Sequence, residues 1–331
     1  MKLRLHNKIA GSELTLPVCA VIAVTMWWLP ERILSLHSFL GLVLCLLTTY
    51  VIMETNAQQH VIRIRTRMMS CVWLVLAASF PFMHPLEEPV IAAAFLCASY
   101  YLLFRCYQRH HPQADVFHAF LMLGVGSFFA PVMLPMAVFF FLYIAVFLRS
   151  LTRKAFWAGV LGLIVPYWCY AAWCFVTKDM QSFVDHLPIG IYNLPLPLWE
   201  RMWEEKLSFF LLLGGEARVK LLSVAVIALL SIVSIVHYLR TNYDDKIRVR
   251  MILYIYMLQT LLLMAFLPVQ PAHYKTTMAL LVASASPLIA HYFALSKGIW
   301  GTVFFLLSLL LTAGMAAINL WPADIILYPL W

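Results

Sequence analysis

The longest break between the hydrophobic runs of this chain is TKDMQSFVDHLPIGIYNLPLPLWERMWEEKLSFFLLLGGEAR, residues Thr177 to Arg218. The stretch is polar, yet it is rich in tryptophan and proline, and every other connector is shorter. Because no polar segment exceeds this one, the chain has no room for a separate soluble catalytic domain. We therefore expect membrane helices and the segments that join them to make up the rest of the chain.

The composition points the same way. Of the 331 residues, 63% are hydrophobic and only 11% are charged, whereas soluble domains are about 25% charged. The mean hydropathy is +0.86. A helix needs about 20 apolar residues to cross about 30 Å of hydrocarbon, and many runs approach that length. We predict an all-α, polytopic transmembrane helix bundle that forms a single integral membrane domain over residues 1–331.

The hydrophobic runs predict about eleven spans, if the shorter ones are completed by flanking residues that reach the interface. The predicted spans are Leu14–Leu29, Leu34–Met53, Met68–Met83, Val90–Phe104, two within Val116–Leu148, Ala155–Val176, Val219–Leu239, Met251–Leu267, Thr276–Leu295 and Ile299–Leu320.

The stretch Val116–Leu148 allows two interpretations. As one helix it would be about 50 Å long, too long for a single span. Pro131 and Pro135 lie near its middle, where a turn could join two shorter spans. Basic residues lie on both sides of it, and two crossings would return the chain to the side on which it began. We therefore favour two spans, with one broken helix as the alternative.

Charge gives the orientation. If sides are assigned alternately from a cytoplasmic N-terminus, most of the 23 Lys and Arg residues face the cytoplasm, and most of the 15 Asp and Glu residues face the other side. This assignment places the C-terminus outside the cytoplasm. The basic residues lie in short clusters between apolar runs rather than on one face, so the net charge of +8 does not indicate a nucleic-acid partner.

On this topology residues 177–218 form an extracytoplasmic loop. Trp199, Trp203 and Leu207 recur at helical spacing, which is typical of a short amphipathic helix in the membrane interface. The loop is either a structural lid over the bundle or a gate over a substrate cavity.

Several charged residues and histidines at extracytoplasmic span ends are candidates for a shared catalytic site. Carboxylates there could act as general bases in the transfer of a lipid-linked sugar. The alternative is that they are ordinary charges at the ends of membrane helices. The candidates are Glu31, Arg32, Asp185, His186, Arg201, His273 and Lys275.

A second candidate site is the basic ladder Arg63, Arg65 and Arg67, just before the span that begins at Met68. Such a cluster attracts anionic lipid headgroups, and the phosphate of a polyprenyl-linked substrate carries the same charge. The alternative is that the three arginines only set the orientation of the chain.

The spans themselves hold almost no ionisable residues, which argues against a proton-coupled transporter. His118, Gln259 and His291 are the nearest exceptions, and we expect them to form hydrogen bonds between helices. His110 and His111, with His118 seven residues on, are too few for a di-iron site. We expect neither a metal nor a cofactor.

Four short patterns support a resemblance: Asn56, Phe80-Pro81, Ser127-Phe128-Phe129-Ala130-Pro131, and the helix from Trp157 to Tyr167 with Gly162 and Pro166. In these the chain resembles a family of uncharacterised multi-pass inner-membrane proteins of Gram-negative bacteria. The resemblance covers roughly a third of the chain. It implies the bacterial inner (cytoplasmic) membrane but no activity, so it assigns no functional residue.

More distantly, many helices with one sizeable extracytoplasmic loop are similar in layout to envelope polysaccharide polymerases and glycosyltransferases. Our first hypothesis is a component of cell-envelope glycan or lipid assembly that acts on polyprenyl-linked substrates. If it is an enzyme, we expect a membrane glycosyl transferase or a polymerase-like enzyme. The second hypothesis is a non-enzymatic scaffold or accessory subunit, and the third is a transporter. The expected partners are the lipid bilayer, a polyprenyl-linked glycan and other envelope proteins.

Overall fold

The computed structural model describes residues 4–28, 35–186 and 215–320, and all regular elements within these ranges are helices. The predicted all-helical class is therefore confirmed for this part of the chain. By its internal contacts the chain divides into two units. Unit 1 comprises Met1–Cys97 and Arg218–Trp331, and unit 2 comprises Ala98–Ala217.

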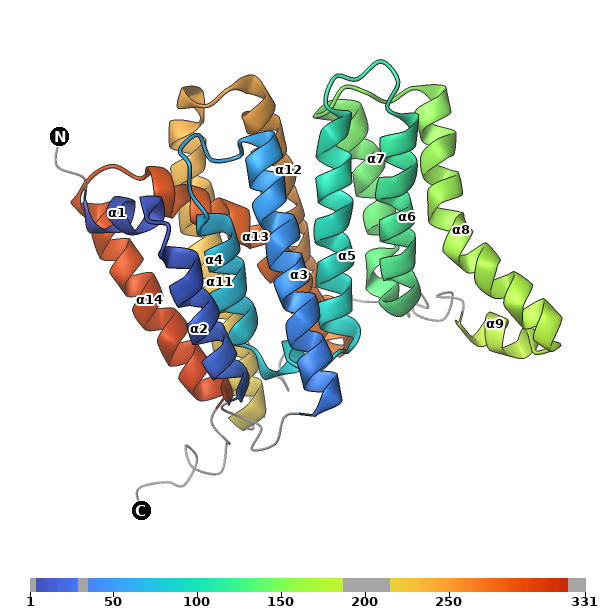
Figure 1. Ribbon diagram of the computed structural model, residues 1–331, viewed down its shortest axis with the longest axis horizontal. Coiled ribbons are helices and arrows are strands. Elements are labelled where there is room, and N and C mark those ends of the chain that lie inside the picture. Colours follow the sequence, from blue (N-terminus) through green and yellow to red (C-terminus); the bar gives the residue numbers. More distant parts are fainter. Residues whose placement is uncertain (1–3, 29–34, 187–214, 321–331) are drawn as a thin grey trace. The chain divides into compact units, whose positions relative to one another are not determined.

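Unit 1 contains most of the long helices (Figure 1). Its elements are α1 (Leu5–Gly11), α2 (Thr15–Trp28), α3 (Leu36–Gln59), α4 (Met68–Ala78), η1 (Pro81–Met83), α5 (Glu88–Leu103, which continues into unit 2), α11 (Gly215–Thr241), η5 (Asn242–Asp244), α12 (Ile247–Phe266), η6 (Pro271–His273), α13 (Tyr274–Leu295) and α14 (Ile299–Leu320).

Helix α13 forms the core of unit 1. Every residue from Thr276 to Ala294 is buried, although α13 is apolar enough to face lipid. Its middle is ASASP (Ala283–Pro287), and such small side chains let neighbouring backbones approach closely. Helices α4, α12, α1 and α14 pack around it.

Hydrogen bonds and ion pairs mark the two ends of unit 1. At one end they join Thr66 to Ala10, Arg63 to Asp244, and His6 to Ser296. At the opposite end they join Trp27 to Ser38, Thr276 to Glu88, and Asn319 to Ser79. Each of α2, α3, α4, α12, α13 and α14 therefore starts at the end of the unit where the preceding helix stops.

Helix α1 is bent by 89° from α2, so it lies across the end of unit 1 (Figure 1). Its buried side carries His6 and Ala10. The His6 ring accepts from the Thr302 hydroxyl at 2.9 Å and donates to the Ser296 carbonyl at 3.0 Å. These bonds hold α1 on the connector between α13 and α14.

Unit 2 contains η2 (Phe104–Cys106), α6 (Gln113–Phe129), η3 (Pro131–Met133), α7 (Met136–Val146), α8 (Arg153–Thr177) and α9 (Met180–His186). The stretch 116–148 therefore forms two helices, separated by a break at Ala130-Pro131. The Gln108 amide donates to the Leu148 carbonyl at 3.0 Å. Helix α7 thus returns to the end of unit 2 at which α6 begins.

Helices α6 and α8 pack with their backbones in close approach. A Cβ atom on Gly124 would lie 2.8 Å from the Leu163 carbonyl oxygen, and one on Gly162 would overlap the Phe117 carbonyl oxygen. The Ser127 and Tyr167 hydroxyls lie 3.0 Å apart and join the two helices further along.

Among the described residues, seven helices are long and apolar enough to cross a membrane, or eight if the bent pair α1–α2 is one span. Helices α4, α6 and α7 are shorter than this. Within the predicted span Met68–Met83, the α-helix ends at Ala78. Pro81 lacks an N–H and disfavours helical geometry in Phe80, so a 3-10 turn follows. Conversely, α3 continues past Met53 to Gln59.

We predict that Gly162→Ala destabilises the protein by about 1–3 kcal/mol, because the added methyl group must push α6 away from α8. The measurement is the thermal unfolding midpoint of the purified chain in detergent. Gly314→Ala is the matched control, since nothing lies within 4 Å of a Cβ at that position. Equal midpoints for the two variants would contradict the close packing.

Candidate functional site

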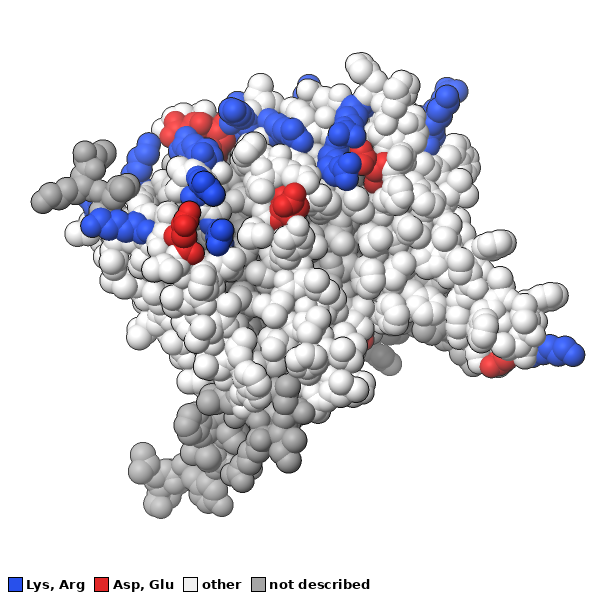
Figure 2. Space-filling view, viewed as in Figure 1, with Lys and Arg blue, Asp and Glu red and all other residues white. Residues whose placement is uncertain are grey.

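Lysine and arginine side chains gather at one end of unit 1, which we call the basic end (Figure 2). It is the end formed by α1, the α3–α4, α11–α12 and α13–α14 connectors, and the adjoining helix ends. Its cations are Arg4, Lys8, Arg63, Arg65, Arg67, Arg240, Lys246, Arg248, Arg250 and Lys297. Its acids are Glu13, Glu54, Asp244 and Asp245. The excess of cations makes this end attractive to anions.

An ion-pair cluster holds three connectors of the basic end together. The Arg63 guanidinium donates to the Asp244 carbonyl at 3.0 Å and lies 3.4 Å from the Asp244 carboxylate. It also lies 3.9 Å from the Asp245 carboxylate. Lys297 approaches Asp244 to 3.5 Å. Arg63, from the predicted basic ladder, therefore has carboxylate partners within the protein.

Beneath this cluster lies a buried pair, Asp245 and His291. The His291 Nε2 atom lies 3.0 Å from the Asp245 carboxylate, and each side chain is only 3% exposed. The expected hydrogen-bonding role of His291 is confirmed, although its partner is a connector residue rather than another helix. His118 differs from expectation, because its Nδ1 atom lies 2.6 Å from the Ala114 carbonyl of its own helix. Gln259 is buried in α12.

Asn56 shapes the loop that carries the basic ladder. Its side-chain amide donates to the Thr66 carbonyl at 3.0 Å, and its oxygen accepts from the Ile62 amide at 3.0 Å. These two bonds bridge the loop from its beginning to its end. The loop then places Arg65 and Arg67 at the surface, both exposed.

Neither Arg65 nor Arg67 forms an ion pair within the described residues, and the same holds for Arg4 and Lys8. Arg67 directly precedes α4, and Lys8 lies on α1. The basic end thus has two kinds of cation. Arg63 and Lys297 are paired with carboxylates, whereas these four have no carboxylate partner in that part of the chain.

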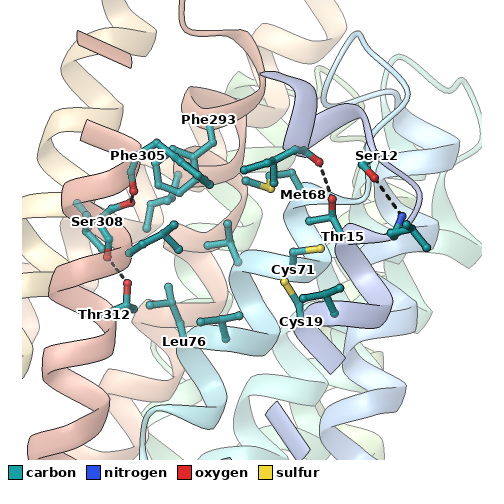
Figure 3. Close-up of a pocket in the computed structure, with 18 residues that line it drawn as sticks. Ser12, Thr15, Cys19, Met68, Cys71, Leu76, Phe293, Phe305, Ser308 and Thr312 are labelled. Atoms are coloured by element: carbon teal, nitrogen blue, oxygen red, sulfur yellow. Dashed lines mark hydrogen bonds between the residues drawn. The ribbon is translucent and has the colours of Figure 1, made fainter. Parts of the chain in front are cut away.

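An apolar cleft of about 390 Å³ lies in unit 1 (Figure 3). Its walls come from the α1–α2 bend, α4, α11, α13 and α14, and include Met68, Val72, Phe293 and Phe305. The cleft begins beside Ile9 and Met68, the neighbours in sequence of Lys8 and Arg67.

The hydroxyl groups along the cleft already have partners. Thr15 donates to the Ile9 carbonyl at 2.5 Å, Ser308 donates to the Phe305 carbonyl at 2.7 Å, and Thr312 donates to the Ser308 carbonyl (Figure 3). A ligand in the cleft would therefore meet mainly methyl, methylene and aromatic groups.

The structure tests the grouping of the extracytoplasmic candidates only in part. Glu31, Arg32 and Arg201 lie outside the described residues, as does the helix expected around Trp199 and Trp203. Asp185 and His186 end α9 in unit 2, and their side chains are also outside the described set.

Two candidates lie at the opposite end of unit 1. His273 precedes α13, and Lys275 lies exposed in its first turn. Nearby, the Thr276 hydroxyl donates to the Glu88 carboxylate at 2.9 Å. Because a helix rises 1.5 Å per residue, about 27 Å separate His273 from His291 at the basic end. One phosphate group cannot contact both His273 and the arginine ladder.

Within residues 4–28, 35–186 and 215–320, no group of three or more His, Cys, Asp or Glu side chains could hold a metal ion. All seven cysteines are free. The pairing of Asp245 with His291 was not predicted from the sequence. The available signal was a single histidine within an apolar run and two adjacent aspartates in a basic connector.

No protein-family model, curated protein or solved structure matches the chain. The helices define the chain as a polytopic helical membrane protein. The resemblance to multi-pass inner-membrane proteins stays a prediction. Within this chain, the residues that carry it have structural roles: Asn56 shapes a connector, Pro81 follows the end of α4, and Ser127, Gly162 and Tyr167 pack α6 against α8.

We predict that Asp245→Ala destabilises the protein by about 3 kcal/mol, because it leaves the His291 ring buried without its partner. The neighbouring Asp244→Ala is the matched control. The Asp244 side chain is 28% exposed, so its loss should cost about 1 kcal/mol or less. Thermal unfolding is measured for Asp244→Ala, Asp245→Ala, His291→Ala and the double variant of Asp245 and His291. The last three give the coupling between Asp245 and His291. Additive effects in the double variant would contradict a direct interaction.

Proposed function

We propose that the chain crosses the bacterial inner membrane eleven times, with the N-terminus in the cytoplasm and the C-terminus outside it. The alternating helix directions within unit 1 and the α6–α7 turn in unit 2 support this number of crossings. The cations at the basic end of unit 1 support its cytoplasmic placement.

The shortness of α4 is compatible with a crossing. Eleven helical residues span about 16 Å, roughly half of the hydrocarbon. All of α4 except Val75 is buried, and the following residues 79 and 80 are buried too. Non-helical backbone is tolerated at membrane depth where protein rather than lipid surrounds it. Residues 79–83 can therefore complete the crossing inside unit 1.

We predict that a cysteine at Leu134, in the α6–α7 turn, is labelled in intact cells by a membrane-impermeant maleimide. The turn is extracytoplasmic if α6 and α7 are two full crossings. The variant is made in a chain without the native cysteines, and a cysteine at Tyr243, in the α11–α12 connector, is the cytoplasmic control. Labelling of position 134 only after lysis would show that the pair does not cross.

For the activity, we infer that the basic end binds the phosphate of a polyprenyl-linked lipid, as part of cell-envelope glycan or lipid assembly. The observation that carries this proposal is the exposed pair Arg65 and Arg67, which have no carboxylate partner among the described residues. Arg67 directly precedes Met68, a lining residue of the apolar cleft. A lipid phosphate has an anionic group that can bind the arginines and a hydrocarbon chain that can bind the apolar cleft.

The distance between the two ends of unit 1 limits the mechanism. A phosphate at Arg65 and Arg67 lies about a membrane thickness from His273 and Lys275, so the latter cannot act on it there. The proposal is therefore a binding function for the basic end. A glycosyl-transfer step at the opposite end would require the lipid headgroup on that side.

We predict that replacing both Arg65 and Arg67 with Gln weakens binding of a fluorescent polyprenyl phosphate to the purified chain at least tenfold. Each charge-assisted hydrogen bond contributes about 1.5–3 kcal/mol, and about 1.4 kcal/mol corresponds to a factor of ten. Arg240→Gln, an exposed cation at the same end, is the control for net charge. Equal affinity in the double variant and the control would contradict the site.

The same variants test the pathway in cells. A strain lacking the protein should accumulate one polyprenyl-linked intermediate, measured by mass spectrometry. Arg240→Gln should restore the normal profile, and the double variant should not. An unchanged profile in the strain without the protein would exclude a role in the turnover of these lipids.

A further inference from the structure

The apolar cleft of unit 1 is open towards the lipid-facing surface. Three residues of its lining, Leu14, Val18 and Leu309, are 70%, 55% and 48% exposed. Leu14 directly precedes α2, Val18 lies in the first turn of α2, and Leu309 belongs to α14. A chain in the surrounding bilayer can therefore enter sideways between these two helices.

The size and chemistry of the cleft suit one hydrocarbon chain. Its volume of about 390 Å³ lies near the lower limit of ligand pockets, roughly 300–1,000 Å³. Its hydroxyl groups are bonded to the backbone of their own segments. The lining runs along α4 from Met68 to Leu76, about 12 Å of helix. Such a slot accommodates part of a single chain better than two chains side by side.

Charge identifies the headgroup. Lys8 and Arg67 directly precede the lining residues Ile9 and Met68, and both cations are exposed. Glu13, a carboxylate that is also exposed, adjoins the lining residue Ser12. His6 fixes α1, which carries both Lys8 and the lining residue Ile9, over the α13–α14 connector. An anionic group bound there would lead directly into the apolar slot.

We propose that this cleft binds the hydrocarbon chain of a polyprenyl phosphate, whose phosphate lies between Lys8 and Arg67. The proposal rests on the proposed function for the choice of lipid. A polyprenyl phosphate has one chain on one phosphate, which matches a single slot that continues from a single group of cations. A glycerophospholipid would leave its second chain outside.

Photolabelling of the full chain in nanodiscs tests the position of the chain. The probe is a polyprenyl phosphate with a photoreactive group on its second isoprene unit, and labelled peptides are mapped by mass spectrometry. We expect labels on cleft-lining residues of α4 and α14, such as Val72 and Leu309. Labels confined to outward-facing residues such as Leu310 would overturn the proposal.

Two variants that fill the cleft add a quantitative test. Ser308→Phe places a ring inside it, and Val18→Trp blocks its exposed opening. Each should reduce labelling of the cleft at least fivefold. Their matched controls, Leu310→Phe on α14 and Val21→Trp on α2, alter exposed residues outside the lining and should leave labelling unchanged. Val18 is more than half exposed, so its substitution tests the cleft even if Ser308→Phe fails to fold. Unchanged labelling in Val18→Trp overturns the proposal.

A competing probe separates this inference from the proposed function. Photoreactive phosphatidylglycerol should label the cleft weakly and be displaced by polyprenyl phosphate. If it labels the cleft and is not displaced, the occupant is a bilayer phospholipid and the proposal is wrong. If polyprenyl phosphate binding depends on Arg65 and Arg67 but the label lies elsewhere, the cleft assignment fails and the proposed function stands. If polyprenyl phosphate does not bind at all, both fail.

Discussion

Unit 1 depends on the burial of α13 and on the polar contacts at its two ends. The middle of α13 has small side chains that let neighbouring helices pack close to the α13 backbone. Near one end the Thr276 hydroxyl bonds the Glu88 carboxylate, and near the other the His291 ring bonds the Asp245 carboxylate. These partners belong to segments far away in sequence. The two contacts therefore fix the position of α13 along its axis, which apolar packing alone leaves free to slide.

The same arrangement determines which cations are left to bind ligands. Asp244 and Asp245 are needed to hold the connectors, and they engage Arg63 and Lys297. Arg65 and Arg67 lie on the same loop as Arg63 but make no such pair within the described residues. The loop is held by Asn56 and by the Arg63 contacts. Because the protein fixes its shape, an anion that binds there need not order it, which reduces the entropic cost of binding.

Much of the fold follows from the sequence, because hydrophobic runs of membrane length leave few alternatives to helices. The break within 116–148 was predictable from its prolines, and the structure has two helices there. The early end of α4 was missed, since Pro81 lay within an otherwise apolar run. The 89° bend after α1 was also missed, since it depends on contacts that His6 makes with residues about 290 positions away.

The candidate site was less predictable than the fold. The arginine ladder is visible in the sequence, but its division into paired Arg63 and exposed Arg65 and Arg67 depends on the α11–α12 connector. The cleft has no local signature at all, because five distant segments line it. Sequence analysis grouped residues by the side of the membrane, which identifies the end of a bundle but not the neighbours of a side chain within it.

The short, enclosed helix α4 has a consequence for how the protein responds to its membrane. A lipid-exposed helix that is too short for the bilayer forces the lipid to thin or the helix to straighten, at a cost that rises with the mismatch. Apart from the side that lines the cleft, helix α4 is covered by neighbouring helices of unit 1. The hydrophobic thickness that unit 1 presents to lipid is therefore set by longer helices such as α3, α11 and α14. A change in bilayer thickness acts on those helices rather than on the arginine loop that leads into α4.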